Sequence, residues 1–273
     1  MVIKSVGCLS LILGIMLPIT ASLATIPSQV KNPVNSSMEI SLKFPDVPDG
    51  EGPVSTAGGG TRTGECKISE IPMTALVPSK NTSTVSANPT FFVYIPKITF
   101  SQESNNTTVP ESGVVLGEFV LVDHKGNDVY NTMIQLPLEG SIVRIALPKT
   151  VALEVGIQYK WQFSIKCQNK NSASTDFASL PELAFLEVYI QRNELTPTLK
   201  RELEKTKDPL KKAEIYVREN LWQDTLMIMA QLRNSQQEEW KSLLNSIKIE
   251  ESIIDVPFAP EPTVSNPDDQ SAQ

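Results

Sequence analysis

Apolar and polar residues alternate along the middle of the chain, most clearly over residues 158–167. Every second residue in this segment is apolar or a cysteine, namely Tyr159, Trp161, Phe163, Ile165 and Cys167. A period of two places one face of a strand in the core and the other face in water. The segment therefore predicts a half-buried strand with Trp161 and Cys167 on its core side.

Other short apolar runs, bounded by Pro, Gly and polar turn residues, predict further strands. They cover residues 71–77, 90–95, 114–122, 129–136, 141–147 and 183–191. The polar stretch 123–128 contains a Gly and predicts a hairpin between its flanking strands. About seven short strands in one stretch are typical of a sandwich. We therefore expect an immunoglobulin-like antiparallel β-sandwich over residues 61–192.

Tyr159 is a more specific indication of this class. It follows Gly156 by three residues and begins the clearest strand. In immunoglobulin-like sandwiches a Tyr at the start of a late strand bonds through its hydroxyl to the preceding turn. A buried Trp beside a disulfide is another hallmark, so Tyr159 and Trp161 are predicted structural core residues. The spacing of the cysteines differs from that of antibody domains, so the prediction is the class of fold and not that family.

After residue 192 the apolar period changes from two to 3.6, which predicts helices. Thr196-Pro197 and Asp208-Pro209 are N-cap and N1 pairs, and Ser235-x-x-Glu238 fits a capping box. The apolar stripes comprise Leu210, Ala213, Leu221, Trp222, Leu226, Met229, Trp240, Leu243, Leu244 and Ile247. Residues 193–250 thus predict a helical hairpin that gives an α+β chain overall, with Trp222 in its core. One such unit must pack on the sandwich or on a partner.

The two ends of the chain lack a sustained period. Residues 1–24 indicate a secretory signal peptide, whose apolar run is shorter than the ~20 residues that span a membrane. Residues 25–60 are rich in Pro, Gly, Ser, Thr and Asn and predict a disordered leader. Residues 251–273 hold five acids, four Pro and no base, which predicts a disordered acidic tail. Apolar residues at 253–258 leave a short docking segment open as the alternative.

Charge and cysteine content narrow the function. The net charge of −7 argues against a nucleic-acid partner, because a polyanion requires a basic surface. Signal cleavage removes Cys8 and leaves Cys66 and Cys167. In an oxidising compartment such a pair predicts a disulfide. After cleavage we expect no integral membrane span.

Several short sequence words occur in one order over residues 58–245. They are Gly58–Arg62, Thr74–Pro78, Pro89–Tyr94, Glu118–Asp123, Val129-Tyr130, Leu153–Gly156, Tyr159-x-Trp161, Cys167, Gln191-Arg192 and Leu221–Asp224. In these words the chain resembles the family catalogued as domain of unknown function 928, found in exported cyanobacterial proteins. It departs from the family at Asn220, where Gly is frequent, and at Val188-Tyr189, where Gly-Trp is frequent. The resemblance implies the same fold and export, and it implies no activity.

The sequence offers no complete catalytic or metal-binding set. His124 lies in the predicted hairpin turn, and no Gly-x-Ser-x-Gly elbow accompanies it. One His and two cysteines do not complete a zinc site. Nucleotide-binding glycine motifs are also absent from the sequence. We therefore expect no catalytic residues, no metal and no cofactor.

Arg62 and Arg192 are the candidate ligand contacts, because both lie in family-like words and Arg clamps carboxylates or sugars. The alternative is that each caps a sheet edge or pairs with an acid. Paired carboxylates in the strand region are the alternative chemistry, as in glycoside hydrolysis. The acids available there are Glu118, Asp123, Asp128, Glu139, Glu154, Asp176 and Glu187.

Two functions follow from these observations. The first is a non-enzymatic envelope or secreted interaction module whose partner is another envelope or secreted protein, since sandwiches present recognition loops on a rigid scaffold. Its place would be the periplasm, the cell surface or the medium. The second is an envelope polysaccharide hydrolase that uses paired carboxylates.

Overall fold

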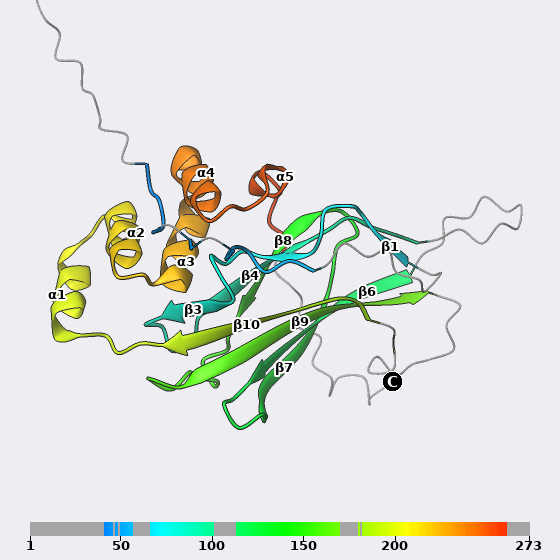
Figure 1. Cartoon of the computed structure of the whole chain (residues 1–273), viewed down its shortest axis with the longest axis horizontal. Helices are drawn as coiled ribbons and strands as arrows, with labels where there is room; N and C mark the ends of the chain where they lie inside the picture. The colour runs from blue at the N-terminus through cyan, green and yellow to red at the C-terminus, as the bar shows by residue number, and fades with distance from the viewer. Residues whose placement is uncertain are drawn as a thin grey trace, which may run out of the picture. The chain divides into compact units, whose positions relative to one another are not determined.

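In the part of the chain that the structure describes, the strands lie between residues 66 and 192 and the helices follow them, as the computed structural model in Figure 1 shows. The structure describes residues 41–45, 47–48, 50–56, 66–100, 113–169, 180 and 182–260. The predicted signal peptide, Arg62 and Asp176 lie outside these residues. None of the described helices is both long and apolar enough to cross a membrane.

The described residues contain ten strands. They are β1 Cys66–Ile68, β2 Thr74–Ala75, β3 Asn81–Thr84, β4 Thr90–Ile95, β5 Ile98–Phe100, β6 Gly113–Val122, β7 Asp128–Gln135, β8 Ser141–Ala146, β9 Gln158–Asn169 and β10 Glu182–Arg192. The mainly β fold with C-terminal helices is therefore confirmed. Strands β1, β3 and β5 were not predicted, since each is short and only partly apolar.

The strands form sheets of five, three and two strands. Their orders are β3-β10-β9-β6-β7, β2-β4-β8 and β1-β5. The predicted hairpin is confirmed, because β6 pairs antiparallel with β7. One edge of the five-stranded sheet departs from the predicted antiparallel pairing, because β3, which was not predicted, runs parallel to β10. A parallel pair needs a long connection, and the chain between β3 and β10 supplies it.

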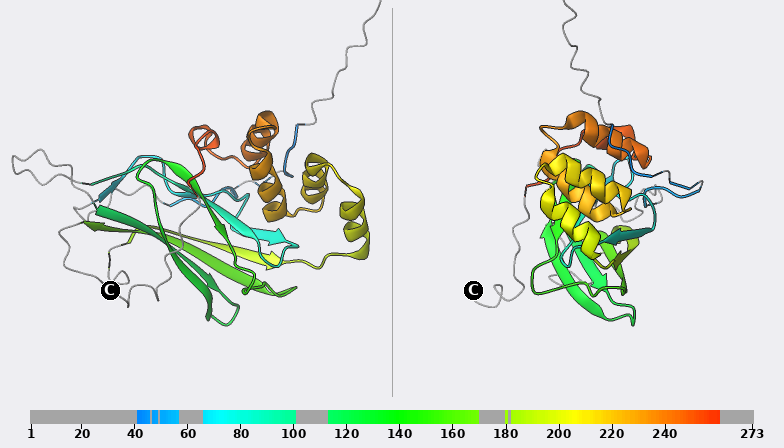
Figure 2. Two further views of the ribbon diagram at one scale, coloured as in Figure 1. Left: turned by 180° about the vertical axis from the view of Figure 1, so that it is seen from behind. Right: turned by 90° about the vertical axis from the view of Figure 1, so that its left-hand side faces the viewer.

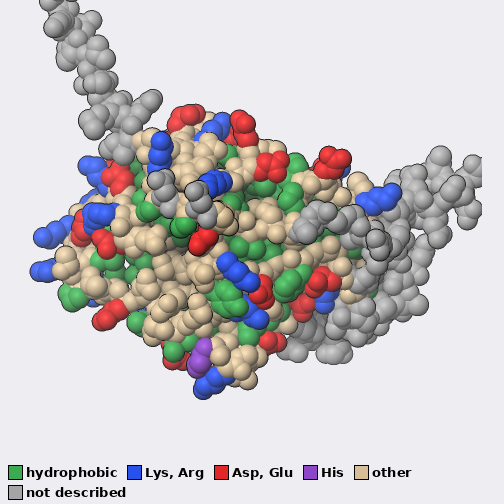
Figure 3. All heavy atoms as spheres, in the orientation of Figure 1, with side chains coloured by type: hydrophobic (Ala, Val, Ile, Leu, Met, Phe, Trp, Pro, Cys, Tyr) green, Lys and Arg blue, Asp and Glu red, His purple; other side chains and the backbone are tan. Residues whose placement is uncertain are grey.

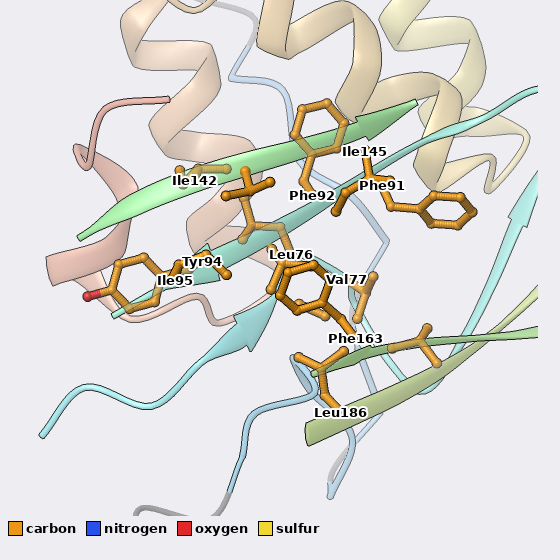
Figure 4. Packing of buried hydrophobic residues seen from close by; sticks show 14 of the residues in the cluster. Leu76, Val77, Phe91, Phe92, Tyr94, Ile95, Ile142, Ile145, Phe163 and Leu186 are labelled. Atoms are coloured by element: carbon orange, nitrogen blue, oxygen red, sulfur yellow. The ribbon is translucent and has the colours of Figure 1, made fainter. Parts of the chain in front are cut away.

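Aromatic side chains join the two larger sheets. The ring of Phe91 on β4 lies 5.0 Å from that of Phe119 on β6 and 5.1 Å from that of Trp161 on β9. Figure 4 shows residues of both sheets, among them Phe91 and Phe163, in this core. The five residues predicted on the core face of β9 are all buried. The alternation of the sequence therefore placed the core face of that strand correctly, whereas Ser164 and Lys166 on the predicted solvent face are also buried.

Two predicted links between distant parts of the chain are present. The hydroxyl oxygen of Tyr159 accepts a hydrogen bond from the backbone N–H of Glu154 at 3.2 Å, as the sandwich class predicts. Cys66 and Cys167 form a disulfide with their Cα atoms 6.5 Å apart. The disulfide ties β1 to β9 and so joins the two-stranded sheet to the five-stranded sheet.

Five helices follow β10 in the described residues: α1 Pro197–Lys205, α2 Pro209–Arg218, α3 Trp222–Leu232, α4 Gln237–Ser246 and α5 Glu251–Ile254. The predicted caps are confirmed, because Thr196 and Asp208 accept hydrogen bonds from the first turns of α1 and α2. Asn220 has a φ of 57° between α2 and α3, a left-handed conformation that Asn tolerates. The predicted capping box is wrong. Helix α4 begins at Gln237, and the Ser235 hydroxyl donates instead to the Leu232 carbonyl at 3.0 Å.

The helices pack on the sandwich, beside β3, β4 and β8 and away from β7 (Figures 1 and 2). The indole Nε1 of Trp222 donates to the Leu76 carbonyl oxygen at 2.8 Å. Trp222, Met229 and Trp240 are buried in the same hydrophobic cluster as Trp161. The helical unit therefore packs on the sandwich and contributes to its core, which is one of the two alternatives that the sequence left open.

Part of the predicted disordered leader packs on the core, so the prediction is wrong for these residues. Leu42, Phe44 and Val47 are buried. The Phe44 ring meets the Trp222 ring edge-on at 4.9 Å, and the Phe44 N–H donates to the Ser246 hydroxyl at 2.9 Å. The polar composition of residues 25–60 hid these isolated apolar side chains.

The first residues of the predicted disordered tail are also ordered, and the docking alternative is the correct one. Ile253 and Ile254 are buried. The N–H of Ile142 donates to the Pro257 carbonyl, and the N–H of Ala259 donates to the Ile142 carbonyl, both at 2.9 Å. The segment therefore docks on β8 because it buries two isoleucines and satisfies an edge strand.

Candidate binding site

A pocket with a volume of about 440 Å³ opens where α3, α4 and the segment after α5 meet. This volume is in the range of small-ligand sites. The residues that line it are Arg233, Asn234, Gln237, Trp240, Lys241, Asp255, Pro257 and Phe258. Cationic, amide and aromatic groups thus face one space that three separate segments enclose.

The docked segment builds one wall of this pocket. Phe258 forms a parallel β-bridge with Ile142 of β8, which fixes its backbone against the sandwich. Its ring then lies 5.8 Å from the Trp240 ring, nearly edge-on at 70°, and 6.2 Å from the Phe92 ring. Because a sheet strand, a helix and the docked segment all hold Phe258, the wall is positioned by tertiary structure.

Arg233 follows the last residue of α3 and is the central cation of the pocket. Its guanidinium lies 5.2 Å from the Trp240 ring centre and 4.9 Å from the Phe258 ring centre, both cation–π distances. Its Nη2 donates to the Ile254 carbonyl at 3.1 Å, and that oxygen also accepts from Trp240 Nε1 at 2.9 Å. Burial lowers the pKa of Arg233, and the charge of Asp255 partly opposes this change.

Lys241 and Asp255 form the second charged element of the pocket. The Lys241 Nζ lies 3.2 Å from a carboxylate oxygen of Asp255. Arg233 forms no ion pair with any carboxylate of the described residues. Two cations and one carboxylate give the lining a net charge of about +1 in a chain of net charge −7. The pocket can therefore accept an anionic group. On the face shown in Figure 3, acidic and basic side chains are interspersed.

Arg192 lies away from this pocket and binds the backbone. Its Nη1 donates to the Leu153 carbonyl at 2.8 Å and its Nε to the Val85 carbonyl at 3.3 Å. The Val85 N–H in turn donates to the Asp224 carboxylate at 3.0 Å. Arg192 and Asp224, which lie in two of the family-like sequence motifs, thus bind the carbonyl and the N–H of Val85. Arg192 acts at a sheet edge, which is the alternative that the sequence left open.

The other residues that the sequence singled out also lie outside the pocket. Tyr159, Trp161 and Trp222 are buried in the core, and Cys66 and Cys167 are joined in the disulfide. His124 is exposed in the turn between β6 and β7. The sequence missed the pocket because its charged residues, Arg233, Lys241 and Asp255, are ordinary surface types that lie in three different segments of the chain. The apolar residues at 253–258 were the only signal.

Three of the carboxylates of the strand region, Glu118, Glu139 and Glu187, are paired with lysines. Glu118 lies 2.8 Å from Lys166, and Glu139 lies 3.0 Å from Lys97. Hydrogen bonding from Lys80 lowers the pKa of Glu187. The hydrogen bond from Lys80 therefore favours the ionised form of Glu187 over its protonated form.

The pKa of Asp123 is lowered, whereas the pKa of Glu182 is raised. The Asn127 side-chain amide donates to Asp123 and, with two backbone N–H groups, lowers the pKa of that carboxyl to about 2. Partial burial raises the pKa of Glu182, and the negative charge of Glu118 adds to this, while Lys166 opposes it. Sequence reasoning did not single out Glu182, whose place beside Glu118 depends on the pairing of β10, β9 and β6.

The fold and the pocket together define a mainly β protein with a disulfide between two sheets and with C-terminal helices. A small net-cationic pocket lies between α3, α4 and the segment after α5. Within the described residues, no group of three or more His, Cys, Asp or Glu is arranged to hold a metal ion. A family model described as Domain of Unknown Function (DUF928) matches residues 57–258. The chain belongs to this family. No match was found among the curated proteins.

Proposed function

We propose that this protein is an exported, non-enzymatic interaction module that binds its ligand or partner at the pocket beside Arg233. The observation that carries the proposal is the half-buried Arg233 guanidinium, which lines the pocket without an ion pair to a described carboxylate. Removing a cation from water costs free energy unless an anion or hydrogen-bond acceptor compensates it. The Ile254 carbonyl and the charge of Asp255 compensate part of this cost, and a bound anionic group would give the guanidinium a direct ionic partner.

Two features support export. Residues 1–24 have the pattern of a secretory signal. The disulfide between Cys66 and Cys167 is of a kind that persists in oxidising compartments. The periplasm, the cell surface or the medium would each provide such conditions, and the partner would be another envelope or secreted protein.

The charges around the strand carboxylates support an interaction role over hydrolysis. A general acid needs a raised pKa near the working pH. The hydrogen bond from Lys80 instead lowers the pKa of Glu187. The pocket contains a single carboxylate, Asp255, and this group is paired with Lys241.

The proposal is tested by expressing the chain with its own residues 1–24 and crosslinking the exported fraction. We expect a processed chain outside the cytoplasm, with no thiol that reacts before reduction. We also expect a crosslinked species that Arg233→Glu removes. Arg218→Glu is the matched control, because Arg218 is an exposed helix arginine that pairs with Glu202. Retention in the cytoplasm would refute export, and a crosslink that both variants leave intact would refute the pocket.

A polysaccharide hydrolase is the second candidate, and one observation favours it. The raised pKa of Glu182, close to the charge of Glu118, is the combination expected of an acid and its partner carboxylate. The test is the release of reducing ends from an isolated envelope polysaccharide. Activity that Glu182→Gln abolishes would support hydrolysis, and equal background release by both proteins would reject it.

A further inference from the structure

We propose that the pocket is a carboxylate-binding site, in which Arg233 binds a monoanionic carboxylate and the Phe258 ring packs against the organic body that bears it. This rests on the proposed function, since it names the ligand class of the same pocket. The ligand is a free small organic acid or the carboxylate end of a longer chain, because both present the same group.

The Arg233 guanidinium has N–H donors that make no hydrogen bond to another described residue. Its Nη2 is used by the Ile254 carbonyl, and its Nε and Nη1 make no hydrogen bond to another described residue. A guanidinium presents its remaining N–H groups in a fixed plane that matches the two oxygens of a carboxylate. The rings of Trp240 and Phe258 hold this plane in place from within the pocket.

The charge of the lining favours a single negative charge. Lys241 adds a second cation, but Asp255 lies 3.2 Å from it and neutralises much of its field. A dianion such as a phosphate monoester would meet the Asp255 carboxylate, and among the cations that line the pocket only Arg233 has no ion pair to a described carboxylate. Arg144 lies outside the lining, with its guanidinium 5.2 Å from the Phe258 ring centre. A monoanionic carboxylate matches the net charge of about +1.

The rest of the lining favours an organic body on the carboxylate. Phe258 is partly exposed, and Pro257 beside it is exposed. The side-chain amides of Asn234 and Gln237 provide donors and acceptors around this apolar wall. A pocket of about 440 Å³ also leaves room beyond a bare inorganic anion.

The experiment follows the Arg233 Nε–H and Trp240 Nε1–H signals of the full exported chain by NMR while two acids are added. The probes are benzoate, for a free acid, and acetyl-Gly-Gly-Phe with a free carboxylate, for a chain end. Benzamide and the corresponding peptide amide are the neutral controls. We expect saturable shifts with a Kd on the order of 1 mM for at least one acid, about tenfold weaker or absent for its amide. Added salt should weaken the binding.

Three variants make the result specific. Arg233→Gln should abolish the acid-dependent shift of Trp240, and Arg233→Lys should retain part of it because the charge stays. Arg218→Gln, on the exposed face of α2, should bind as the parent does. The thermal unfolding of each variant shows whether it is folded. If Arg233→Gln does not fold, the comparison of Arg233→Lys with the parent still tests the proposal.

Each outcome decides the proposal. Binding of benzoate alone supports a small acid, and binding of the peptide acid alone supports a chain end. Equal binding of an acid and its amide, loss of binding in Arg218→Gln, or no binding of either acid would overturn the carboxylate site. In those cases a crosslink that depends on Arg233 would still support the interaction function, so the two proposals fail separately.

Discussion

At the scale of single residues, two of the three buried tryptophans, Trp161 and Trp222, differ in one hydrogen bond. Trp222 Nε1 donates to the Leu76 carbonyl at 2.8 Å. Trp161 Nε1 is buried without a hydrogen-bond partner among the described residues. Trp222→Phe therefore removes a donor that makes a hydrogen bond. Trp161→Phe removes a donor that makes none to a described residue.

We expect Trp222→Phe to lower the free energy of unfolding by about 1–3 kcal/mol more than Trp161→Phe does. The reason is that the Leu76 carbonyl loses its donor, whereas Trp161→Phe leaves no acceptor unpaired. Urea unfolding of the two variants and the parent measures the difference. Equal losses would mean that ring volume decides the cost and the hydrogen bond does not.

The carboxylate of Glu187 gives a prediction for pH. Lys80 lies 2.9 Å from it and, through that hydrogen bond, lowers the pKa of Glu187 below the ordinary value of 4.5. A lowered folded-state pKa contributes stability above pH 4.5, and this contribution is lost as the pH falls through the folded-state pKa. The stability gap between the parent and Glu187→Gln should therefore narrow below pH 4.5 in unfolding curves measured from pH 7 to 3. A gap that stays constant would contradict the pairing.

At the scale of elements, the short segment after α4 connects the helices to the sandwich. It buries Ile253 and Ile254 in α5 and then bridges to Ile142 of β8. Four helical residues are too few to be stable alone. The tertiary contacts of the segment therefore keep it in place, and with it the Phe258 wall of the pocket.

Ile254→Ala should lower the free energy of unfolding by about 2–4 kcal/mol, since Ile254 is 2% exposed and its loss leaves a cavity. Val155→Ala is the control, because Val155 is 49% exposed and should change stability by no more than about 0.5 kcal/mol. Chemical denaturation measures both. If Ile254→Ala were as mild as the control, the segment would be a fraying extension of α4.

At the scale of the whole molecule, strands, helices and the segment near residue 44 share one core. The disulfide between Cys66 and Cys167 closes a separation of 101 residues across it. A loop of this length restricts the unfolded chain strongly, which the chain-entropy model values at about 4–5 kcal/mol. The disulfide is therefore one of the largest single contributions to stability in this fold.

The double variant Cys66→Ala/Cys167→Ala should unfold at a markedly lower temperature than the oxidised parent, with a loss of about 4 kcal/mol. Calorimetry of both proteins, and of the parent with reductant, measures this loss. The reductant should not affect the double variant. An unchanged unfolding temperature would show that the core alone holds β1 against β9.

Local pattern was sufficient for much of the fold. The alternation in residues 158–167 placed a strand and its buried face, and the Thr196 and Asp208 caps placed the starts of two helices. It failed where a segment is too short to carry a period. Strand β3 has four residues and pairs in parallel with β10, which no local signal encodes. The capping box at Ser235 failed because the chain places α4 one residue later than the motif requires.

The sequence by itself determined the mainly β class, the helical ending, the cysteine pair and the family, because each depends on local period, spacing or order along the chain. Only the tertiary structure decided where Arg233, Trp240 and Phe258 meet. These residues come from the end of α3, from α4 and from the docked segment, and their neighbours in sequence are ordinary. Packing against Ile142 and the buried isoleucines brings them together, since the free energy that docks the segment comes from contacts between distant parts of the chain.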